Sequence, residues 1–216
     1  MQFDPTRVAL VDKISSDETL LIRGMDPAVS GTFCKEDILS ALKGLGLKTE
    51  GKKLIVISVI DNTGERWAWA PELQAFGVDP DSIPQDQWPP YVHIPGWDPS
   101  KPLGSNEVGD FYWWPFEGLP DNADPKVFLG SPGWDFSGVV NLVLSLCSRE
   151  KDAIIYFHCM LGADRTGALH TGYLLRGGMD LQEACEIADK ATSAGPPNAD
   201  YIRLRAAYAA SLQGKP

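Results

Sequence analysis

A cysteine and an arginine lie close together in the sequence near the middle of the C-terminal half. They belong to the stretch H-C-M-L-G-A-D-R-T-G at 158–167. A cysteine thiolate is a strong nucleophile, and the planar guanidinium of arginine can hold two oxygens of one phosphate. Because five residues separate Cys159 from Arg165, a loop that turns back on itself can bring both to one anion. The stretch therefore predicts a cysteine nucleophile with an arginine clamp.

The position of this stretch strengthens the prediction. It follows an apolar run at 153–157 (AIIYF) and opens a helical pattern at 165–175. A loop between a strand and a helix N-terminus directs several backbone N–H groups at one spot, where the helix dipole adds positive charge. We expect this field to bind phosphate and to keep Cys159 ionised at neutral pH. The expected phosphate-binding residues are Met160, Leu161, Gly162, Ala163, Asp164 and Arg165.

The C-x5-R stretch, with His158 before it and Thr166-Gly167 after it, resembles the signature of the protein-tyrosine phosphatase superfamily, closest to its small dual-specificity and bacterial tyrosine phosphatases. The resemblance implies a phosphocysteine intermediate on Cys159, with Arg165 stabilising the transferring phosphoryl group. It implies that the Thr166 hydroxyl assists the cysteine as leaving group. It also implies that His158 orients the loop and helps keep the thiol acidic, rather than transferring protons.

Four carboxylates are candidates for the general acid of such an enzyme. The stretch W-P-F-E-G-L-P at 114–120 resembles the family's acid-bearing loop and favours Glu117, although the acid usually follows Trp-Pro directly. Counting back from the nucleophile favours Asp121 or Asp124 instead. Asp164 is a further candidate, because C-x-x-G-x-D-R-T also resembles the myotubularins and certain bacterial lipid-type phosphatases, in which an aspartate inside the loop is given this role.

The substrate class is expected to be an aromatic or modestly charged phosphomonoester. Lipid and inositol-polyphosphate phosphatases of the superfamily usually place lysine in the loop, whereas Met160, Leu161 and Ala163 stand here. The sequence thus favours a protein tyrosine or dual-specificity phosphatase acting on a phosphorylated protein or a small phosphomonoester. An inositol-phosphate or phosphoinositide phosphatase stays open, as does a catalytically weak phosphate-binding module, or pseudophosphatase, which the irregular Trp-Pro stretch supports.

The rest of the chain predicts the scaffold of this loop. Apolar runs predict strands at 19–23, 53–60 and 153–157, and helical spacing predicts helices at 35–47, 135–148, 165–175, 181–192 and 198–212. We expect one α/β domain over residues 1–216, with its core at about 19–212. A central, mainly parallel sheet of four to five strands flanked by helices is expected, in the manner of the dual-specificity phosphatases that the chain resembles.

Residues 67–135 differ in composition, because all seven tryptophans and twelve of the seventeen prolines lie there. They predict a loop insertion with one or two short strands, which either covers the sheet or forms the walls of a cleft.

Composition excludes several other classes of function. A formal net charge of −10 opposes binding to nucleic acid, which needs a basic face. The longest apolar runs, at 54–60 and 139–146, are shorter than the roughly 20 residues that span a bilayer. No secretory signal pattern opens the chain, so a cytoplasmic location is expected, with signal-independent export still open. The four cysteines have no metal-binding spacing, so we expect free thiols, no metal and no cofactor.

Three of the acid candidates, Glu117, Asp121 and Asp164, can be separated by the pH dependence of hydrolysis of an aryl phosphate. Replacing the general acid, in Glu117→Gln, Asp121→Asn or Asp164→Asn, should remove the fall in rate between acidic and neutral pH, because no proton then reaches the leaving oxygen. A variant that keeps this fall unchanged is eliminated as the acid.

Overall fold

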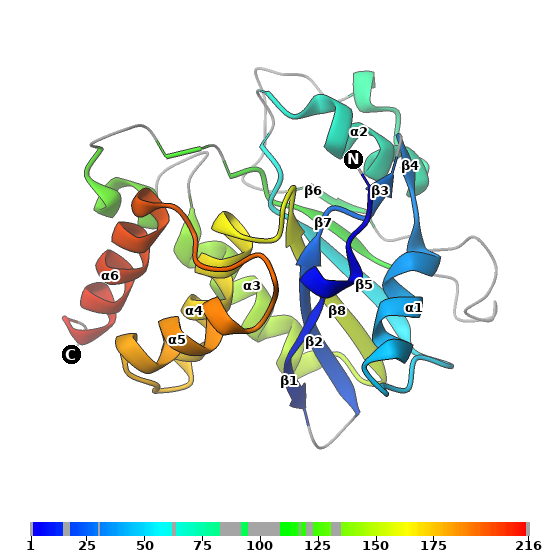
Figure 1. Cartoon of the computed structure of the whole chain (residues 1–216). Helices are drawn as coiled ribbons and strands as arrows, with labels where there is room; N and C mark the ends of the chain where they lie inside the picture. The colour runs from blue at the N-terminus through cyan, green and yellow to red at the C-terminus, as the bar shows by residue number, and fades with distance from the viewer. Residues whose placement is uncertain are drawn as a thin grey trace.

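A six-stranded sheet forms the centre of the computed structural model (Figure 1), which describes residues 2–14, 18–29, 31–61, 64–82, 92–94, 109–116, 118–119, 123–130 and 135–214. In spatial order the strands are β1 (Ala9–Ile14), β2 (Thr19–Met25), β8 (Ala153–Cys159), β5 (Lys53–Ser58), β7 (Phe111–Trp113) and β6 (Val92–Ile94). The four inner strands pair in parallel, and β1 and β6 pair antiparallel at the two edges. β8, which leads into the predicted phosphate loop, is therefore an inner strand.

The α/β class and the parallel centre of the sheet are confirmed, but the sheet has six strands rather than four to five. The unpredicted strand β1 mixes polar and apolar residues and is only partly buried. Such a pattern is typical of an edge strand, whose outer side faces water, and it gives a weak signal in sequence. β6 has only three residues.

Helices cover both faces of the sheet (Figure 1). On one side lie α1 (Lys35–Gly44) and α2 (Arg66–Ala75), and on the other α3 (Phe136–Arg149), α4 (Asp164–Arg176), α5 (Leu181–Lys190) and α6 (Ala199–Gln213). A two-stranded hairpin, β3 (Ala28–Val29) and β4 (Thr32–Phe33), and three 3-10 turns, Pro5–Arg7, Pro80–Ser82 and Pro125–Leu129, complete the described elements. The five helices predicted from spacing are confirmed.

The two faces of β8 belong to different hydrophobic clusters. Ile155 and Phe157 pack with the α3–α6 layer, whereas Ile154 and Tyr156 pack with the α1–α2 layer. Since successive side chains of a strand point to opposite faces, Cys159 continues the first series and His158 the second. The nucleophile and the residue before it are thus supported by different layers of the molecule.

The region at 67–135 contains a helix that its composition did not predict. The two short strands β6 and β7 are confirmed, but α2 occupies the beginning of the stretch, where a loop was expected. Pro71 lies inside this helix, and an interior proline costs about 3 kcal/mol. Burial outweighs that cost, because Ala68, Trp69 and Leu73 form a buried stripe and the Trp69 ring stacks on Trp113 at 4.7 Å. In this part the tryptophans cover the sheet.

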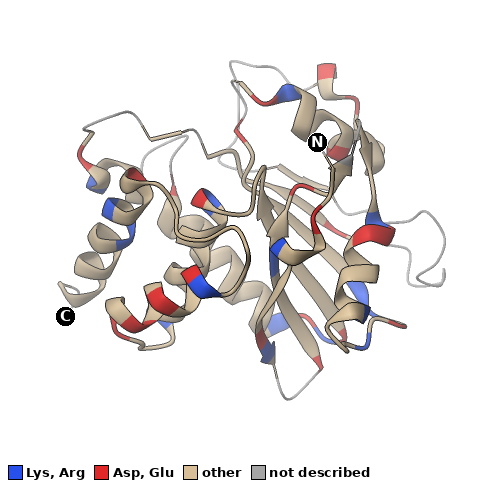
Figure 2. Ribbon diagram, viewed as in Figure 1, with Lys and Arg blue, Asp and Glu red and all other residues tan. Residues whose placement is uncertain are grey.

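Figure 2 shows Lys and Arg interspersed with Asp and Glu on the helices of both layers. Within the described ranges, no helix combines the length and the apolar character needed to cross a bilayer.

A close contact between β2 and β8 generates a prediction about stability. A Cβ added to Gly24 would lie 1.9 Å from the Tyr156 hydroxyl oxygen, whereas a Cβ at Gly44, at the end of α1, would meet nothing within 4 Å. Tyr156 is fully buried and its hydroxyl donates to the Met25 carbonyl at 2.7 Å, so it cannot easily move aside. We expect Gly24→Ala to lower the free energy of unfolding by about 1–3 kcal/mol in urea titrations. The control Gly44→Ala should be neutral or stabilising, and equal effects of the two variants would contradict this account.

Candidate active site

The loop after β8 is held by hydrogen bonds to three successive carbonyls. The Met160 carbonyl accepts the backbone N–H of Asp26 at 3.2 Å, the Leu161 carbonyl accepts Arg7 Nη1 at 2.7 Å, and the Gly162 carbonyl accepts Arg23 Nη2 at 2.6 Å. All three donors come from the first 26 residues. The N-terminal segment therefore fixes the orientation of three consecutive peptide planes.

This anchoring decides where the loop's own donors point. In a planar trans peptide the N–H is directed opposite to the carbonyl, so the N–H groups of Leu161, Gly162 and Ala163 point away from the N-terminal segment. α4 begins at the next residue, and its dipole adds to them. Gly162 is required for the turn, because its φ is +72° and an added Cβ would lie 2.8 Å from the Gly24 carbonyl oxygen. Together these groups form a site for an anion.

Of the two arginines among these donors, Arg23 is the buried one. Its side chain is inaccessible to solvent, and besides Gly162 it donates to the Ala188 carbonyl at 2.6 Å. His170 Nδ1 lies 3.3 Å from Arg23 Nη1. Burial, and then the charge of Arg23, lowers the pKa of His170 to about 3, so the neutral ring can accept this bond. Burial also lowers the pKa of Arg23, to about 10, and leaves it cationic at neutral pH.

Cys159 and Thr166 are brought together as the sequence predicts. Cys159 ends β8 and is 2% exposed. Its backbone N–H donates to Thr166 Oγ1 at 2.8 Å, and the threonine is completely buried in the first turn of α4. The hydroxyl is thus fixed beside the candidate nucleophile, where the role implied by the family resemblance would require it.

Arg165 is held at the loop by a carboxylate that the sequence did not single out. Its Nη1 and Nη2 each donate to one oxygen of Glu65 at 2.8 Å, and Nη1 also lies 3.1 Å from the Val59 carbonyl. Burial alone would lower the pKa of Arg165, but the bonds to Glu65 outweigh it and raise the pKa. Glu65 Oε2 in turn accepts the N–H of Asp61 at 2.9 Å. A bidentate pair of this kind fixes the plane of the guanidinium, and the Nε–H takes no part in these bonds.

His158 contacts two buried acids on the other face of the sheet. Its Nε2 lies 2.8 Å from Glu72 Oε1, and both side chains are inaccessible to solvent. A carboxylate oxygen of Asp26, a carboxylate oxygen of Glu72 and a ring nitrogen of His158 all lie within 4.8 Å of one another. Glu72 belongs to the buried stripe of α2, and a charged residue on an apolar stripe is the sequence signal that was missed. Arg23, in the apolar run of β2, is the same kind of signal.

The general-acid candidates are placed only in part. Glu117 and Asp121 lie outside the described residues. Asp164 Oδ1 accepts the backbone N–H of Asn198 at 2.7 Å, and this bond braces α4 against the start of α6. Asp124 caps a 3-10 turn by accepting the Lys126 N–H at 3.0 Å.

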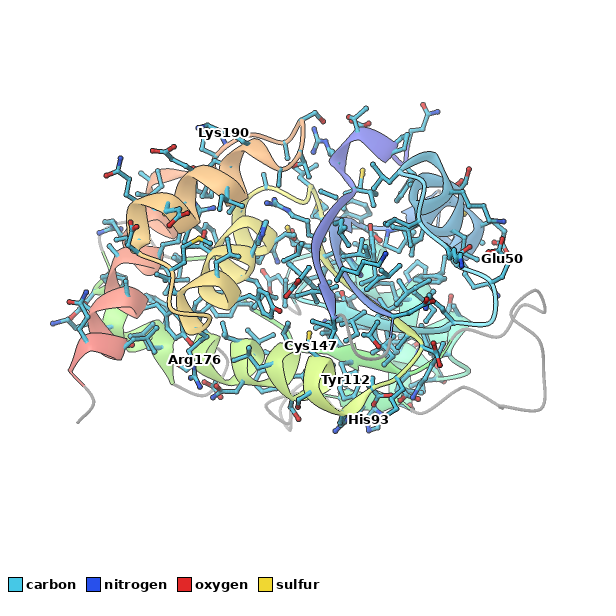
Figure 3. All side chains as sticks on the ribbon, turned by 90° about the horizontal axis from the view of Figure 1, so that it is seen from below. Glu50, His93, Tyr112, Cys147, Arg176 and Lys190 are labelled. Carbon is cyan, nitrogen blue, oxygen red and sulfur yellow. The ribbon has the colours of Figure 1, made fainter. Side chains whose placement is uncertain are left out.

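Four arginines of α3, α4 and α6 contact residues outside the loop. Arg149 donates to Tyr112, Arg176 to Asn141, Arg203 to Asp200 and Arg205 to Asp189. Figure 3 shows Arg176 at the end of α4 that is remote from the loop. Arg7, which the sequence did not single out, is the cation on the loop's outer side.

The cysteines of the described chain are all free thiols, as predicted. Cys147 lies on α3 (Figure 3), and burial raises its pKa to about 12. Asp12 and Tyr173 lie close enough to this thiol to influence its pKa. Asp12 pairs with Leu21 across the sheet, and Leu21 pairs with Ile155 of β8. Since Cys147 is close to Asp12, it lies near the level of Ile155, four positions before Cys159. At about 3.3 Å per residue it is too far away to form a disulfide with Cys159 without a rearrangement.

Comparison with known proteins identifies the fold. No protein-family model and no curated protein matches the sequence. Among solved structures, human DUSP28 is 15% identical, with 99% of this chain and all of that chain covered (100%), at a TM-score of 0.52. A mouse dual specificity phosphatase complexed with zinc tungstate is 16% identical over 99% and 92% of the two chains, at 0.49. The Trypanosoma brucei protein tyrosine phosphatase TbPTP1 is 14% identical over 94% and 72%, at 0.49. The chain therefore has the fold of human DUSP28, and the resemblance stated from the sequence is confirmed at the level of fold.

The anchoring of the loop predicts the effect of removing Arg23. In Arg23→Met the Gly162 carbonyl loses its donor, so the peptide plane is free to turn and its N–H no longer points into the anion site. We expect the affinity for vanadate, measured by calorimetry, to fall by about tenfold or more. The control Arg176→Met removes an arginine of α4 and should keep the affinity of the parent protein. Unchanged vanadate affinity in Arg23→Met would show that the anchor does not shape the site.

Proposed function

We propose that the protein hydrolyses phosphomonoesters through a phosphocysteine intermediate on Cys159. The observation that carries the proposal is the arrangement of the loop. Three anchored carbonyls leave three N–H groups pointing to the opposite side, between Cys159 at the end of β8 and Arg165 at the start of α4. Fixed donors, a helix N-terminus and a guanidinium around a thiol form an environment in which charge on a transferring phosphoryl group is stabilised.

The chemical steps follow from these roles. The Cys159 thiolate attacks phosphorus, a P–S bond forms, and the P–O bond to the alcohol or phenol breaks. The leaving oxygen takes a proton from a general acid. Water then attacks phosphorus and gives a proton to the conjugate base of the general acid, the P–S bond breaks, and inorganic phosphate and the thiolate are released. Arg165, held in plane by Glu65, stabilises the charge in both steps, and Thr166, bonded to the Cys159 N–H, supports the thiolate as leaving group.

The acid remains assigned to Asp121 or Glu117, with Asp164 behind them. The bond from the Asn198 N–H to Asp164 Oδ1 supports this order, because it engages this carboxylate in bracing α4 against the start of α6. The acid role would then fall to the segment that carries Glu117 and Asp121.

The substrate class that we favour is phosphotyrosine in protein, with dual specificity included. The loop presents an exposed Leu161 and a half-buried Met160, and apolar side chains suit an aromatic ring better than additional phosphates. The side chains of four other arginines are engaged elsewhere, which weighs against an inositol polyphosphate: Arg149, Arg176, Arg203 and Arg205.

The test is pre-steady-state hydrolysis of an aryl phosphate, followed by comparison of substrates. We expect a burst of phenol equal to the enzyme concentration, a phosphoenzyme trapped by acid, and loss of both in Cys159→Ser. Phosphotyrosine peptides should be turned over with higher kcat/KM than inositol phosphates on the same preparation. Tight phosphate binding without turnover would instead identify a phosphate-binding module, and the reverse substrate preference would identify an inositol-phosphate phosphatase.

A further inference from the structure

The acids behind the phosphate loop point to a role that no catalytic assignment above includes. Glu72 comes from α2, Asp26 follows β2, and both meet His158 on the face of β8 opposite the α3–α6 layer. All three side chains are buried, with exposed fractions of 0–2%. Charged groups this deeply buried are costly unless they compensate one another.

The charges of this cluster, defined as Asp26, Glu72 and His158, compensate one another in part. Burial alone would lower the pKa of His158, but Glu72 first, and then Asp26 and the Cys159 backbone, outweigh it and raise the pKa. Burial, with the neighbouring Glu72 charge, raises the pKa of Asp26 to about 7. Glu72, whose Oε1 lies 2.8 Å from His158 Nε2, is therefore the main partner of the imidazolium.

The cluster is also joined mechanically to the loop. The Asp26 N–H donates to the Met160 carbonyl, and the Val59 N–H donates to the His158 carbonyl at 2.9 Å. The Asp26 side chain accepts the Ala28 N–H at 2.7 Å, which fixes it in turn. Two of these bonds therefore flank Cys159 directly, one at the residue before it and one at the residue after it.

We propose that Glu72 holds His158 as an imidazolium and thereby stabilises the Cys159 thiolate, while Asp26 fixes the loop through its N–H, so that Glu72 and Asp26 are positioning residues for the nucleophile. The inference deepens the proposed function and rests on it. Its physical basis is that a positive charge on the residue preceding Cys159, in surroundings of low dielectric, favours the ionised sulfur. The direct contact of Glu72 with His158 Nε2 keeps the positive charge on the imidazole ring.

The other titratable groups near the cluster do not replace Glu72. Tyr156 lies beneath the His158 ring, with 5.5 Å between ring centroids, and burial raises its pKa well above the usual value, so it is neutral. Glu65 acts on Asp26 from the start of α2 but is bonded to Arg165. Glu72 is thus the described carboxylate in contact with the imidazole nitrogen.

The experiment measures how fast iodoacetamide alkylates Cys159 as a function of pH, with the Cys159-containing peptide quantified by mass spectrometry. In Glu72→Gln the carboxylate is lost, His158 is deprotonated at lower pH, and the thiolate forms only at higher pH. We expect the midpoint of reactivity to move upward by about one pH unit or more. Asp110→Asn removes a partly buried carboxylate that pairs with Lys53 and serves as matched control, with an unchanged midpoint.

A second variant covers the case in which Glu72→Gln fails to fold, as judged by circular dichroism. His158→Asn removes the charge directly and should produce the same upward shift, and the double variant should shift no further than either single variant. An unchanged midpoint in the folded single variants overturns the inference. So does a stoichiometric metal in the purified protein that Glu72→Gln loses, since the cluster would then be a metal site.

Alkylation needs no turnover, so the two proposals fail separately. A shifted midpoint in a protein that shows no burst of phenol contradicts the proposed function and keeps the positioning role. Normal turnover with an unshifted midpoint supports the proposed function and contradicts the positioning role.

Discussion

The direction of three peptide planes in the loop after β8 is the constraint on which the site depends. A backbone loop has no intrinsic reason to turn its N–H groups to one side, because isolated carbonyls and amides are equally well solvated by water. Here donors from the N-terminal segment form hydrogen bonds to the carbonyls of Met160, Leu161 and Gly162. The opposite ends of the same peptides are left to bind an anion, and the rest of the fold serves to bring these donors to the loop.

The sheet supplies that placement. β2 lies next to β8 in parallel register, with Met25 opposite Cys159, so residues at the end of β2 necessarily meet the loop. Alternation along the strands then divides the support between two layers. Arg23 and Cys159 face the α3–α6 layer, and the cluster around His158 faces the α1–α2 layer. Each side of the loop thus has a buried charged group, and each group is compensated within its own layer.

Much of this arrangement could be predicted from the sequence, and the limits have physical causes. The strand, the loop and α4 follow from local patterns, and the family resemblance implies the expected roles of Cys159, Arg165 and Thr166. Glu65 and Glu72 could not be found by spacing, because they reach the loop from about a hundred residues away through the pairing of β5 with β8. The helix α2 was missed because Pro71 breaks the local pattern, while the burial of Trp69 against Trp113 that stabilises it is a tertiary contact.

The account is tested most directly by a crystal structure of the protein with bound vanadate. The account predicts vanadium within bonding distance of the Cys159 sulfur, with vanadate oxygens accepting the N–H groups of Leu161, Gly162 and Ala163 and the guanidinium of Arg165. The carbonyls of the loop should keep their bonds to Arg7, Asp26 and Arg23. Vanadate bound elsewhere, or loop carbonyls turned toward the anion site, would contradict the central claim.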